Sequence, residues 1–254
     1  MTDIDEALDW QGKPISCDIC AHQALLAEGL CQLRRACVHD RYARRIDRFF
    51  YWNRALANDY LAHPYFEVRA IAAKFADVFR LPPLLEDADE TVRFSALIRL
   101  PRKYLLKMRH DPDREVRIRV AYRMESRDLL EMRADPDYYV RLVVARRLPP
   151  ESLHLLLHDA DREVRLMVAR RIGAEWLSKL TADTDADVRL EVARRLDGDD
   201  LLSLLNDPDW RVRYEVASRG ETGRLVQLLD DKDELVREMA RSRIKGEELV
   251  PCNT

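Results

Sequence analysis

The residues with the clearest potential chemistry are four cysteines near the start of the chain. They are Cys17, Cys20, Cys31 and Cys37, and no other cysteine occurs before Cys252. Thiolates are soft ligands that hold iron–sulfur clusters and zinc. Because the acidic start MTDIDEALDW is neither a secretory signal nor a transit peptide, metal binding or reactive thiols are favoured over disulfides. We expect the first four cysteines to form one site and Cys252 to be a free thiol.

The spacing of these cysteines distinguishes several kinds of site. Cys17 and Cys20 form a Cys-x-x-Cys pair, a common start of an iron–sulfur site. Structural zinc usually takes two closely spaced pairs, with about two to four residues between the members of each. The members of the second pair, Cys31 and Cys37, lie further apart than that. The spacing favours a cluster and leaves zinc and redox-active thiols open, with His22 and His39 as alternative ligands because they lie close to the cysteines in the sequence.

Arginine is concentrated around the second cysteine pair. Seven Arg and two Asp lie between Cys31 and Arg54. Nearby cations would stabilise the reduced form of an anionic cluster and raise its potential. The same residues could be a solvated helix face, or a positive docking patch for an acidic redox partner or nucleic acid. Six of the seven lie closest to the cysteines: Arg34, Arg35, Arg41, Arg44, Arg45 and Arg48.

The composition excludes several classes of protein. Charged residues make up 35% of the 254 residues, yet the formal net charge is only -3. The chain lacks the excess of base that a whole-chain nucleic-acid binder would show. No run approaches the roughly 18 apolar residues of a membrane span, so we expect a cytoplasmic protein. We expect no enzyme, because no Gly-rich phosphate loop, His-Glu-x-x-His or Gly-x-Ser-x-Gly motif occurs.

The elements that must position the cysteines belong to a repeated pattern. A Val-Arg pair recurs at a constant 24-residue step, without insertion. Such a strict period is the signature of a solenoid, in which each repeat stacks on its neighbours. The pairs are Val68-Arg69, Val92-Arg93, Val116-Arg117, Val140-Arg141, Val164-Arg165, Val188-Arg189, Val212-Arg213 and Val236-Arg237.

Each repeat contains signals for two helical elements. Asp111 is a good N-cap and Pro112 suits the first helical position, so they predict a helix of about 12 residues. An apolar stripe at helical period then includes Val116, Val120 and Met124. In the second element the apolar residues are three apart, as in Leu105 and Met108 or Leu129 and Met132, which predicts a short 3₁₀ or α segment.

Residues that recur in every repeat are expected to serve the repeat itself. The paired arginines, such as Arg117 and Arg123, recur alongside Asp residues. We interpret them as a ladder of Asp–Arg pairs between adjacent repeats and not as a nucleic-acid surface. The residue type just before the Val-Arg pair varies between repeats, and aromatic residues occur there at Tyr138, Tyr139 and Trp210. We interpret these three as either contact anchors for a partner or packing residues.

The ends of the array are expected to differ from its middle. Arg41 to Tyr60 reads as a helix, and its Phe49 to Trp52 run joins the cysteine segment to the first repeat. Phe75 replaces the second Arg of the first repeat. The predicted divisions are a cysteine cluster domain (1–48), an aromatic capping helix or linker (49–62), an eight-repeat solenoid (63–246) and a C-terminal tail (247–254). His63 and Lys232 also depart from the repeat, at positions usually held by Asp and by Pro or Ala.

The four cysteines and the unit Leu-x-x-Leu…Asp-x-Asp-x-x-Val-Arg-x-x-Val-Ala-x-Arg-Leu resemble the leucine-rich repeat variant family of iron–sulfur proteins. The resemblance covers nearly the whole chain. It implies an all-α, right-handed solenoid of α-helices alternating with 3₁₀-helices, without β-strands. It further implies that a small N-terminal domain carries one four-iron four-sulfur cluster. Zinc, which the spacing alone leaves open, is the alternative occupant. The family is linked to bacteria that fix nitrogen and brings no biochemical activity. By the resemblance, the cluster ligands are Cys17, Cys20, Cys31 and Cys37.

Taken together, these features predict a protein-interaction solenoid with a redox or sensing cluster at one end. Its partner would be a protein, acidic where it meets the Arg-rich cap; we expect neither nucleic acid nor a membrane. One alternative is a structural scaffold in which the metal only clips the cap. Another is a nucleic-acid-binding helical-repeat protein, disfavoured by the acidic C-terminal repeats. Lyase-type HEAT-like repeats look similar but are longer, so the short, unbroken step of this chain disfavours them.

Overall fold

The structure, a computed structural model, describes residues 6–248 of the chain. The regular structure in this part is helical, and β-pairing is limited to two isolated bridges. The chain divides into two compact parts, here called the N-terminal half (Met1–Met124) and the C-terminal half (Glu125–Thr254). No helix among residues 6–248 is long and apolar enough to cross a membrane. Cys252 lies outside the described residues.

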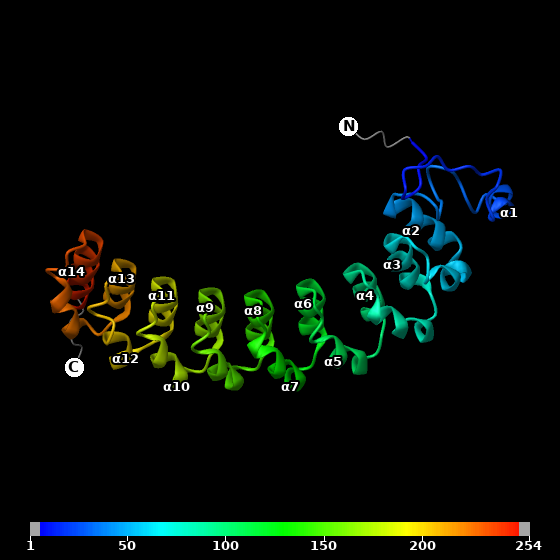
Figure 1. The fold of residues 1–254 in the computed structure, drawn as a ribbon. Helices are drawn as coiled ribbons and strands as arrows, with labels where there is room; N and C mark the ends of the chain where they lie inside the picture. Colours follow the sequence, from blue (N-terminus) through cyan, green and yellow to red (C-terminus); the bar gives the residue numbers. More distant parts are fainter. Residues whose placement is uncertain (1–5, 249–254) are drawn as a thin grey trace, which may run out of the picture. The chain divides into compact units, whose positions relative to one another are not determined.

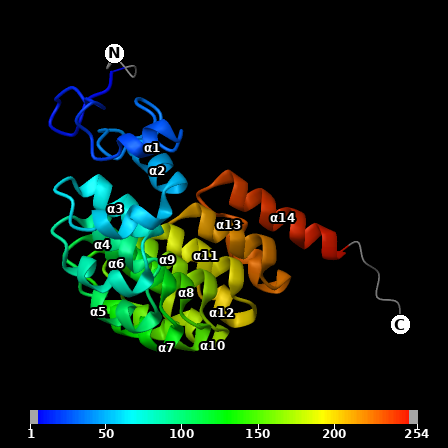
Figure 2. The ribbon, with the colours of Figure 1, turned by 90° about the vertical axis from the view of Figure 1, so that its right-hand side faces the viewer.

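The N-terminal half begins with the cysteine segment and continues into the first repeats (Figure 1). Figure 2 shows the cysteine segment, in dark blue, as largely irregular chain beside α2. The elements are α1 (Gln23–Ala27), α2 (Ala43–Trp52), η1 (Arg54–Tyr60), α3 (Phe66–Phe75), η2 (Val78–Arg80), η3 (Pro82–Glu86), α4 (Glu90–Leu97), η4 (Arg102–Tyr104), α5 (Leu105–Met108) and α6 (Arg114–Arg123), where η marks a 3₁₀-helix.

The C-terminal half contains further repeats of the same kind, whose long helices stand side by side in Figure 1. The last helix, α14, continues as one longer helix, as Figure 2 shows. The elements are α7 (Ser126–Leu129), η5 (Leu130–Ala134), α8 (Tyr138–Arg147), η6 (Pro150–Leu156), α9 (Arg162–Arg171), α10 (Ala174–Leu177), η7 (Ser178–Leu180), α11 (Ala186–Arg195), α12 (Gly198–Leu202), α13 (Trp210–Arg219), η8 (Thr222–Leu228) and α14 (Glu234–Glu248).

The predicted alternation of a longer helix with a short helical segment is confirmed. A typical long helix has ten residues, slightly fewer than expected. The second elements are 3₁₀-helices, single α turns or a combination of the two. Both predicted apolar patterns are buried. Val116 and Val120 lie on α6 and Met124 is its C-cap, and the residues of the second pattern, Leu129 and Met132, are three apart. Burial of these side chains supplies the stacking energy that a single repeat lacks.

The position of the helix N-cap differs from the sequence-based expectation. The cap of α6 is Asp113, whose Oδ1 accepts hydrogen bonds from the amides of Glu115 and Val116. Asp111 was the expected cap, but its carboxylate instead binds Arg93 and accepts a hydrogen bond from the amide of Asp113. The first Asp of each Asp-x-Asp motif therefore serves the contact between repeats, and the second begins the helix.

The expected ladder between adjacent repeats is confirmed for the first Arg of the repeat. Its Nε and Nη2 atoms donate hydrogen bonds to both carboxylate oxygens of the Asp that precedes the next long helix. In the pair Arg93–Asp111, these N···O distances are 2.8 and 2.7 Å. Its Nη1 binds carbonyl oxygens in the loop before its own helix. We call this arrangement the inter-repeat fork. The forks are Arg69–Asp87, Arg93–Asp111, Arg141–Asp159, Arg165–Asp183, Arg189–Asp207 and Arg213–Asp231.

The second Arg of the repeat serves the same stacking in another way. Arg195 donates hydrogen bonds to the carbonyl groups of Ala169 and Ile172, at the C-terminal end of the preceding helix α9. Arg219 does the same at the end of α11. A guanidinium at this position satisfies carbonyls that a helix leaves without partners and complements the helix dipole. These arginines therefore use their hydrogen-bond donors for contacts between adjacent repeats.

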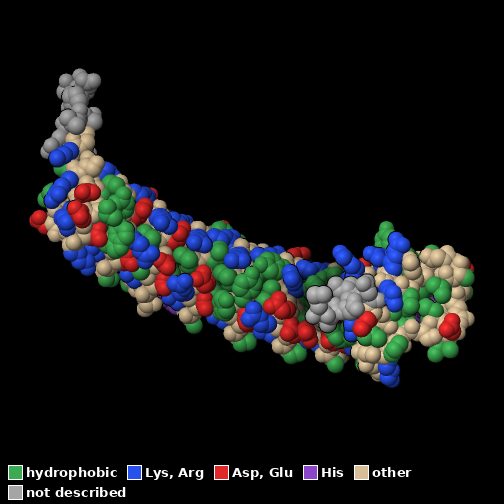
Figure 3. Space-filling model, turned by 90° about the horizontal axis from the view of Figure 1, so that it is seen from above, with side chains coloured by type: hydrophobic (Ala, Val, Ile, Leu, Met, Phe, Trp, Pro, Cys, Tyr) green, Lys and Arg blue, Asp and Glu red, His purple; other side chains and the backbone are tan. Residues whose placement is uncertain are grey.

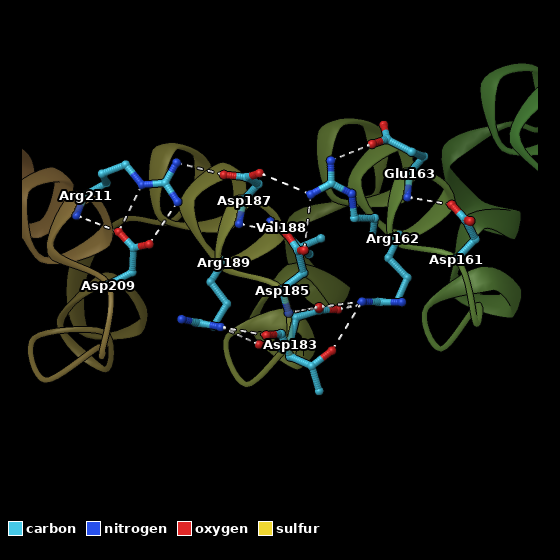
Figure 4. Close-up of polar contacts among 12 residues, drawn as sticks. Asp161, Arg162, Glu163, Asp183, Asp185, Asp187, Val188, Arg189, Asp209 and Arg211 are labelled. Atoms are coloured by element: carbon cyan, nitrogen blue, oxygen red, sulfur yellow. Dashed lines mark hydrogen bonds and ion pairs between the residues drawn. The ribbon is translucent and has the colours of Figure 1, made fainter.

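A more exposed charge network runs along the helix N-termini of the C-terminal half (Figure 4). Arg211 binds both Asp209 in its own repeat and Asp187 in the preceding one, at 2.9 Å each. Arg162 lies 3.5 Å from both Asp185 and Asp187. Figure 3 shows positive and negative side chains mixed over one face of the half. Exposed pairs of this kind contribute little individually.

The helix expected over Arg41 to Tyr60 is interrupted at Asn53. Helix α2 ends at Trp52, and η1 covers the remainder. The side-chain amide of the buried Asn53 donates to the carbonyl groups of Phe49 and Leu30, which ends α2 and ties it to the cysteine segment. The predicted divisions at residues 48, 62 and 246 stay predictions; α2 and α14 run through the first and last of them.

The inter-repeat fork should make stability depend on acid pH. The hydrogen bond from Arg213 lowers the pKa of Asp231, and both side chains are buried. Because this pKa is lower in the folded state, the contribution of the fork is complete above the unfolded value of about 3.9 and is lost as the pH falls through the folded value. We expect Asp231→Asn to cost about 2 kcal/mol at neutral pH, and the difference from wild type to shrink towards about pH 2.

Urea unfolding of both proteins between neutral and acid pH measures this difference. Asp197→Asn is the matched control, because Asp197 binds Arg219 but its side chain is 87% exposed. That substitution should cost less than about 1 kcal/mol at any pH. A cost of Asp231→Asn that stays the same at low pH would contradict the assignment.

Candidate metal centre

The structure gathers the four expected cysteines in the cysteine segment of the N-terminal half. Cys17 and Cys20 lie in one turn before α1, in which the amide of Cys20 donates to the carbonyl of Cys17. Cys31 follows α1 and Cys37 precedes α2. All four are free thiols; the first pair is partly exposed and the second pair is buried. The site therefore has one open side and one closed side.

A tight loop between Cys31 and Cys37 determines how these two cysteines lie relative to each other. The amide of Gln32 donates to the carbonyl of Ala36 and the amide of Ala36 to that of Gln32, both at 2.8 Å, so the chain doubles back between the two cysteines. Arg34 lies at the tip of this loop with φ 64°, a left-handed conformation that is uncommon for a residue with a Cβ. The turn brings the thiols of Cys31 and Cys37 into hydrogen-bond contact.

The thiols influence each other electrostatically. Burial raises the pKa of Cys17, and the charges of Cys37 and Cys20 raise it further. The hydrogen bond with Cys31 raises the pKa of Cys37, which burial raises as well, while the same bond lowers the pKa of Cys31. Four thiolates so close together would repel one another unless a cationic group neutralised them. Binding of such a group would release protons and stabilise the fold.

A buried ion pair supports the closed side of the site. Asp40 is fully buried, and its Oδ2 accepts from Nη1 of Arg45 at 2.9 Å. Its Oδ1 accepts from the amide of Tyr42, beside the start of α2. The backbone connects this pair to Cys37, whose amide donates to the carbonyl of Arg45 and whose carbonyl accepts from the amide of Asp40.

Sequence reasoning did not assign this role to Arg45, although a signal was present. Arg45 precedes Arg69 by one full repeat step, so it continues the series of fork arginines towards the N-terminus. At the position where its fork Asp would stand, the chain has His63, and Arg45 binds Asp40 instead. His63 keeps one function of the missing Asp, because its Nδ1 accepts a hydrogen bond from the amide of Tyr65.

The two histidines near the cysteines are placed differently. Burial lowers the pKa of His22 and raises that of Tyr60 to about 12. Nε2 of His22 forms a hydrogen bond with the hydroxyl of Tyr60. That nitrogen is thus occupied. His39 stacks on His22 and lines a hollow of about 350 Å³ beside Cys20. The hollow opens the exposed side of the site to solvent.

The donor set consists of four cysteine thiols within one segment. Thiolates hold iron–sulfur clusters, which take each thiolate on a separate iron atom, and they also hold structural zinc, which takes four ligand atoms around one point. Across residues 6–248, no group of three or more His, Cys, Asp or Glu side chains is placed so that it could hold one metal ion. By their chemistry the four thiols fit either group.

The remaining residues singled out in the sequence take varied positions. Arg41 binds Glu6 at 3.8 Å and Arg45 is buried, whereas Arg34, Arg35 and Arg44 are exposed and Arg48 is partly exposed. Of the aromatic run, Phe49 and Phe50 are fully buried, and Tyr51 is exposed. Phe75 packs near Phe50, and so replaces the second Arg of the repeat with an aromatic contact to the cap. Tyr138 and Trp210, each the first residue of its helix, are 42% and 40% exposed.

A cysteine-rich N-terminal segment followed by stacked α/3₁₀ repeats defines a helical-repeat protein with a cysteine-rich cap. Comparison with known proteins gives the family. The family model "LRV protein FeS4 cluster" matches residues 7–59, and "Leucine rich repeat variant" matches residues 186–209. A solved structure described as a leucine-rich repeat variant with a novel repetitive structural motif is 44% identical, with a TM-score of 0.83 over 90% of this chain and 98% of its own. The chain belongs to the leucine-rich repeat variant family.

A second relative extends the comparison. The "Uncharacterized 27.7 kDa protein in nifB 3'region" of Rhodobacter capsulatus is 53% identical over 96 residues. The match covers 38% of this chain and 39% of that relative, so the chain spans well under half of the relative's length.

The buried Asp40–Arg45 pair should be essential to the cysteine domain. Asp40→Ala leaves a buried guanidinium without its carboxylate and is expected to cost about 3–5 kcal/mol. Asp47→Ala is the matched control, because Asp47 binds Lys74 with both side chains nearly half exposed, and it should cost less than about 1 kcal/mol. Urea unfolding of the full-length variants measures both. Equal costs would show that the buried pair does not support the site.

Proposed function

We propose that this protein is an iron–sulfur repeat protein that binds one four-iron four-sulfur cluster through Cys17, Cys20, Cys31 and Cys37. The observation that carries the proposal is the gathering of four free thiols in one domain, together with the match of residues 7–59 to an iron–sulfur family model. The cluster would supply one-electron chemistry. The protein would hold it on the buried thiols and leave the side of Cys17 and Cys20 accessible.

We further propose that the repeats form a protein-interaction surface and that the cluster is a redox or sensing group for the bound partner. Both recurrent arginines are used within the array, which leaves the variable positions for contacts. The exposed Tyr138 and Trp210 support this role, since exposed aromatics are frequent anchors of interfaces. No catalysis by side chains is proposed. The name of the Rhodobacter relative, which places it in a nifB region, supports a link to nitrogen fixation.

A purely structural role of the cluster is the second candidate. It is favoured by the bonds that tie the cysteine segment to neighbouring elements. Asn53 binds the carbonyl of Leu30, beside Cys31, and Tyr60 binds His22. A metal group at this point would close the end of the repeat array against solvent. In that case the cluster would not need to change its oxidation state.

A potentiometric titration of the full-length protein, purified without oxygen, separates the two roles. The redox proposal predicts a one-electron transition that is reversible on repeated cycling. A cluster that can be neither reduced nor reoxidised without loss of iron would reject the redox role and leave the structural one.

Cysteine variants test the ligand assignment in the same titration. Cys31→Ser removes a buried ligand and should abolish or strongly shift the transition. Cys252→Ser is the control and should leave both the iron content and the midpoint potential unchanged. Equal effects of the two substitutions would contradict the assignment.

A further inference from the structure

The outer face of α2 and the loop between Cys31 and Cys37 carry a compact group of arginines. Arg44, Arg48 and Trp52 follow one another at four-residue spacing along α2, so they share one face of the helix. Nη1 of Arg48 donates to the carbonyl of Arg35 at 3.2 Å, and the guanidinium of Arg35 lies 5.8 Å from the ring of Trp52. The loop therefore rests on the helix, and the arginines of both form one surface.

Two further residues extend this surface. Arg54 places its guanidinium 5.4 Å from the ring of Tyr51, which is 61% exposed. Arg34 stands at the tip of the loop in its left-handed conformation, and local strain of this kind is often kept where a side chain must be presented. We call the whole surface the arginine face; it consists of Arg34, Arg35, Arg44, Arg48, Tyr51, Trp52 and Arg54.

These arginines are not neutralised by the described part of the protein. Among residues 6–248, no carboxylate forms an ion pair with Arg34, Arg35, Arg44, Arg48 or Arg54. The acid nearest to them on α2, Asp47, binds Lys74 instead. This sets them apart from the fork arginines of the repeats, each of which pairs with an Asp. Five guanidinium groups left without a carboxylate in this part of the chain, beside aromatic rings, form a binding surface for negative charge.

The location of the arginine face relates it to the metal centre. Arg34 and Arg35 belong to the loop that joins Cys31 to Cys37, and the amide of Cys37 binds the carbonyl of Arg45 on α2. A molecule bound to this face would thus lie over the loop that carries the second cysteine pair. Cys31 and Cys37, at the two ends of this loop, are buried.

We propose that the arginine face is the docking surface for an acidic electron-transfer protein. The inference rests on the proposed redox role of the cluster and adds the chemistry and position of the partner. Carboxylates on the partner would pair with the guanidinium groups, and Tyr51 and Trp52 would supply apolar contact area. Single-stranded nucleic acid could use the same kinds of group, but the chain as a whole has a formal net charge of -3 and lacks the excess of base that nucleic-acid binders show, which favours a protein partner.

Binding of a known acidic redox protein tests the proposal. The probe is a plant-type ferredoxin, and its affinity for the full-length, cluster-loaded protein is measured by thermophoresis over a range of salt concentrations. Charge complementarity predicts measurable binding at low salt that weakens as salt rises. The test variant is Arg35→Glu, Arg44→Glu, Arg54→Glu, in which all three side chains are exposed. It should bind the probe at least about tenfold more weakly.

The matched control makes the same change in net charge elsewhere. It is Arg133→Glu, Arg224→Glu, Arg241→Glu, three exposed arginines of the C-terminal half, and it should change the affinity by less than about threefold. Equal weakening in both variants, or none in the test variant, would overturn the proposal. Failure to bind ferredoxin together with patch-dependent binding of a single-stranded oligonucleotide would overturn it in favour of nucleic acid.

The outcome is separable from that of the redox proposal. Salt-sensitive, patch-dependent binding of ferredoxin by a protein whose cluster does not titrate would support the arginine face and reject the redox role. A reversible cluster in a protein that shows no patch-dependent binding would support the redox role and reject the arginine face.

Discussion

The fork between an arginine of one repeat and the aspartate that opens the next is the interaction on which the array depends. In the pair Arg93–Asp111 the side chains are 9% and 1% exposed, so neither charge could remain there without the other. The carboxylate belongs to the loop that begins the next repeat, and the same guanidinium also fixes the loop that begins its own. Each repeat is therefore completed by its neighbour, which ties the fold of one unit to the presence of the next.

In the cysteine domain, the arginine at the fork position does not bind an aspartate of the next repeat. Arg45 occupies the fork position one step before the first repeat, but it turns to Asp40 and holds the start of α2 beside Cys37. His63 replaces the aspartate it would otherwise have met, and Phe75 replaces the second arginine and contacts Phe50. The helix α2 of the cap thus stands where a repeat would have its long helix. It keeps one ion pair, Arg45–Asp40, and contacts Phe75 through the aromatic ring of Phe50 where a repeat would have an arginine. Within the described residues, the exposed arginines Arg34, Arg35, Arg44 and Arg54 of the cap have no carboxylate partner, unlike the fork arginines of the array.

Much of this organisation could be predicted from the sequence, because it repeats. The strict period identified the helices, the buried Leu pairs and the Asp–Arg ladder, since a pattern imposed in every repeat reports a contact made in every repeat. The predicted N-cap of α6, Asp111, lies two residues before the observed one, Asp113. Both residue types are good N-caps, and Asp111 is not the cap because its carboxylate binds Arg93 of the preceding repeat. The break at Asn53 was missed because it depends on the carbonyl of Leu30, a contact between distant parts of the chain.

The candidate metal centre could be proposed from the sequence as a set of four cysteines, but the packing around these cysteines could not. Clustering in the sequence singled out the four cysteines, whereas the buried Asp40, the Tyr60–His22 bond and the stacking of Arg35 on Trp52 come only from the folded chain. The most direct measurement on the central claim is metal analysis of protein purified without oxygen, with its visible spectrum. About four iron and four sulfide per chain and a broad band near roughly 400 nm are predicted. A colourless protein with about one zinc per chain would contradict the account.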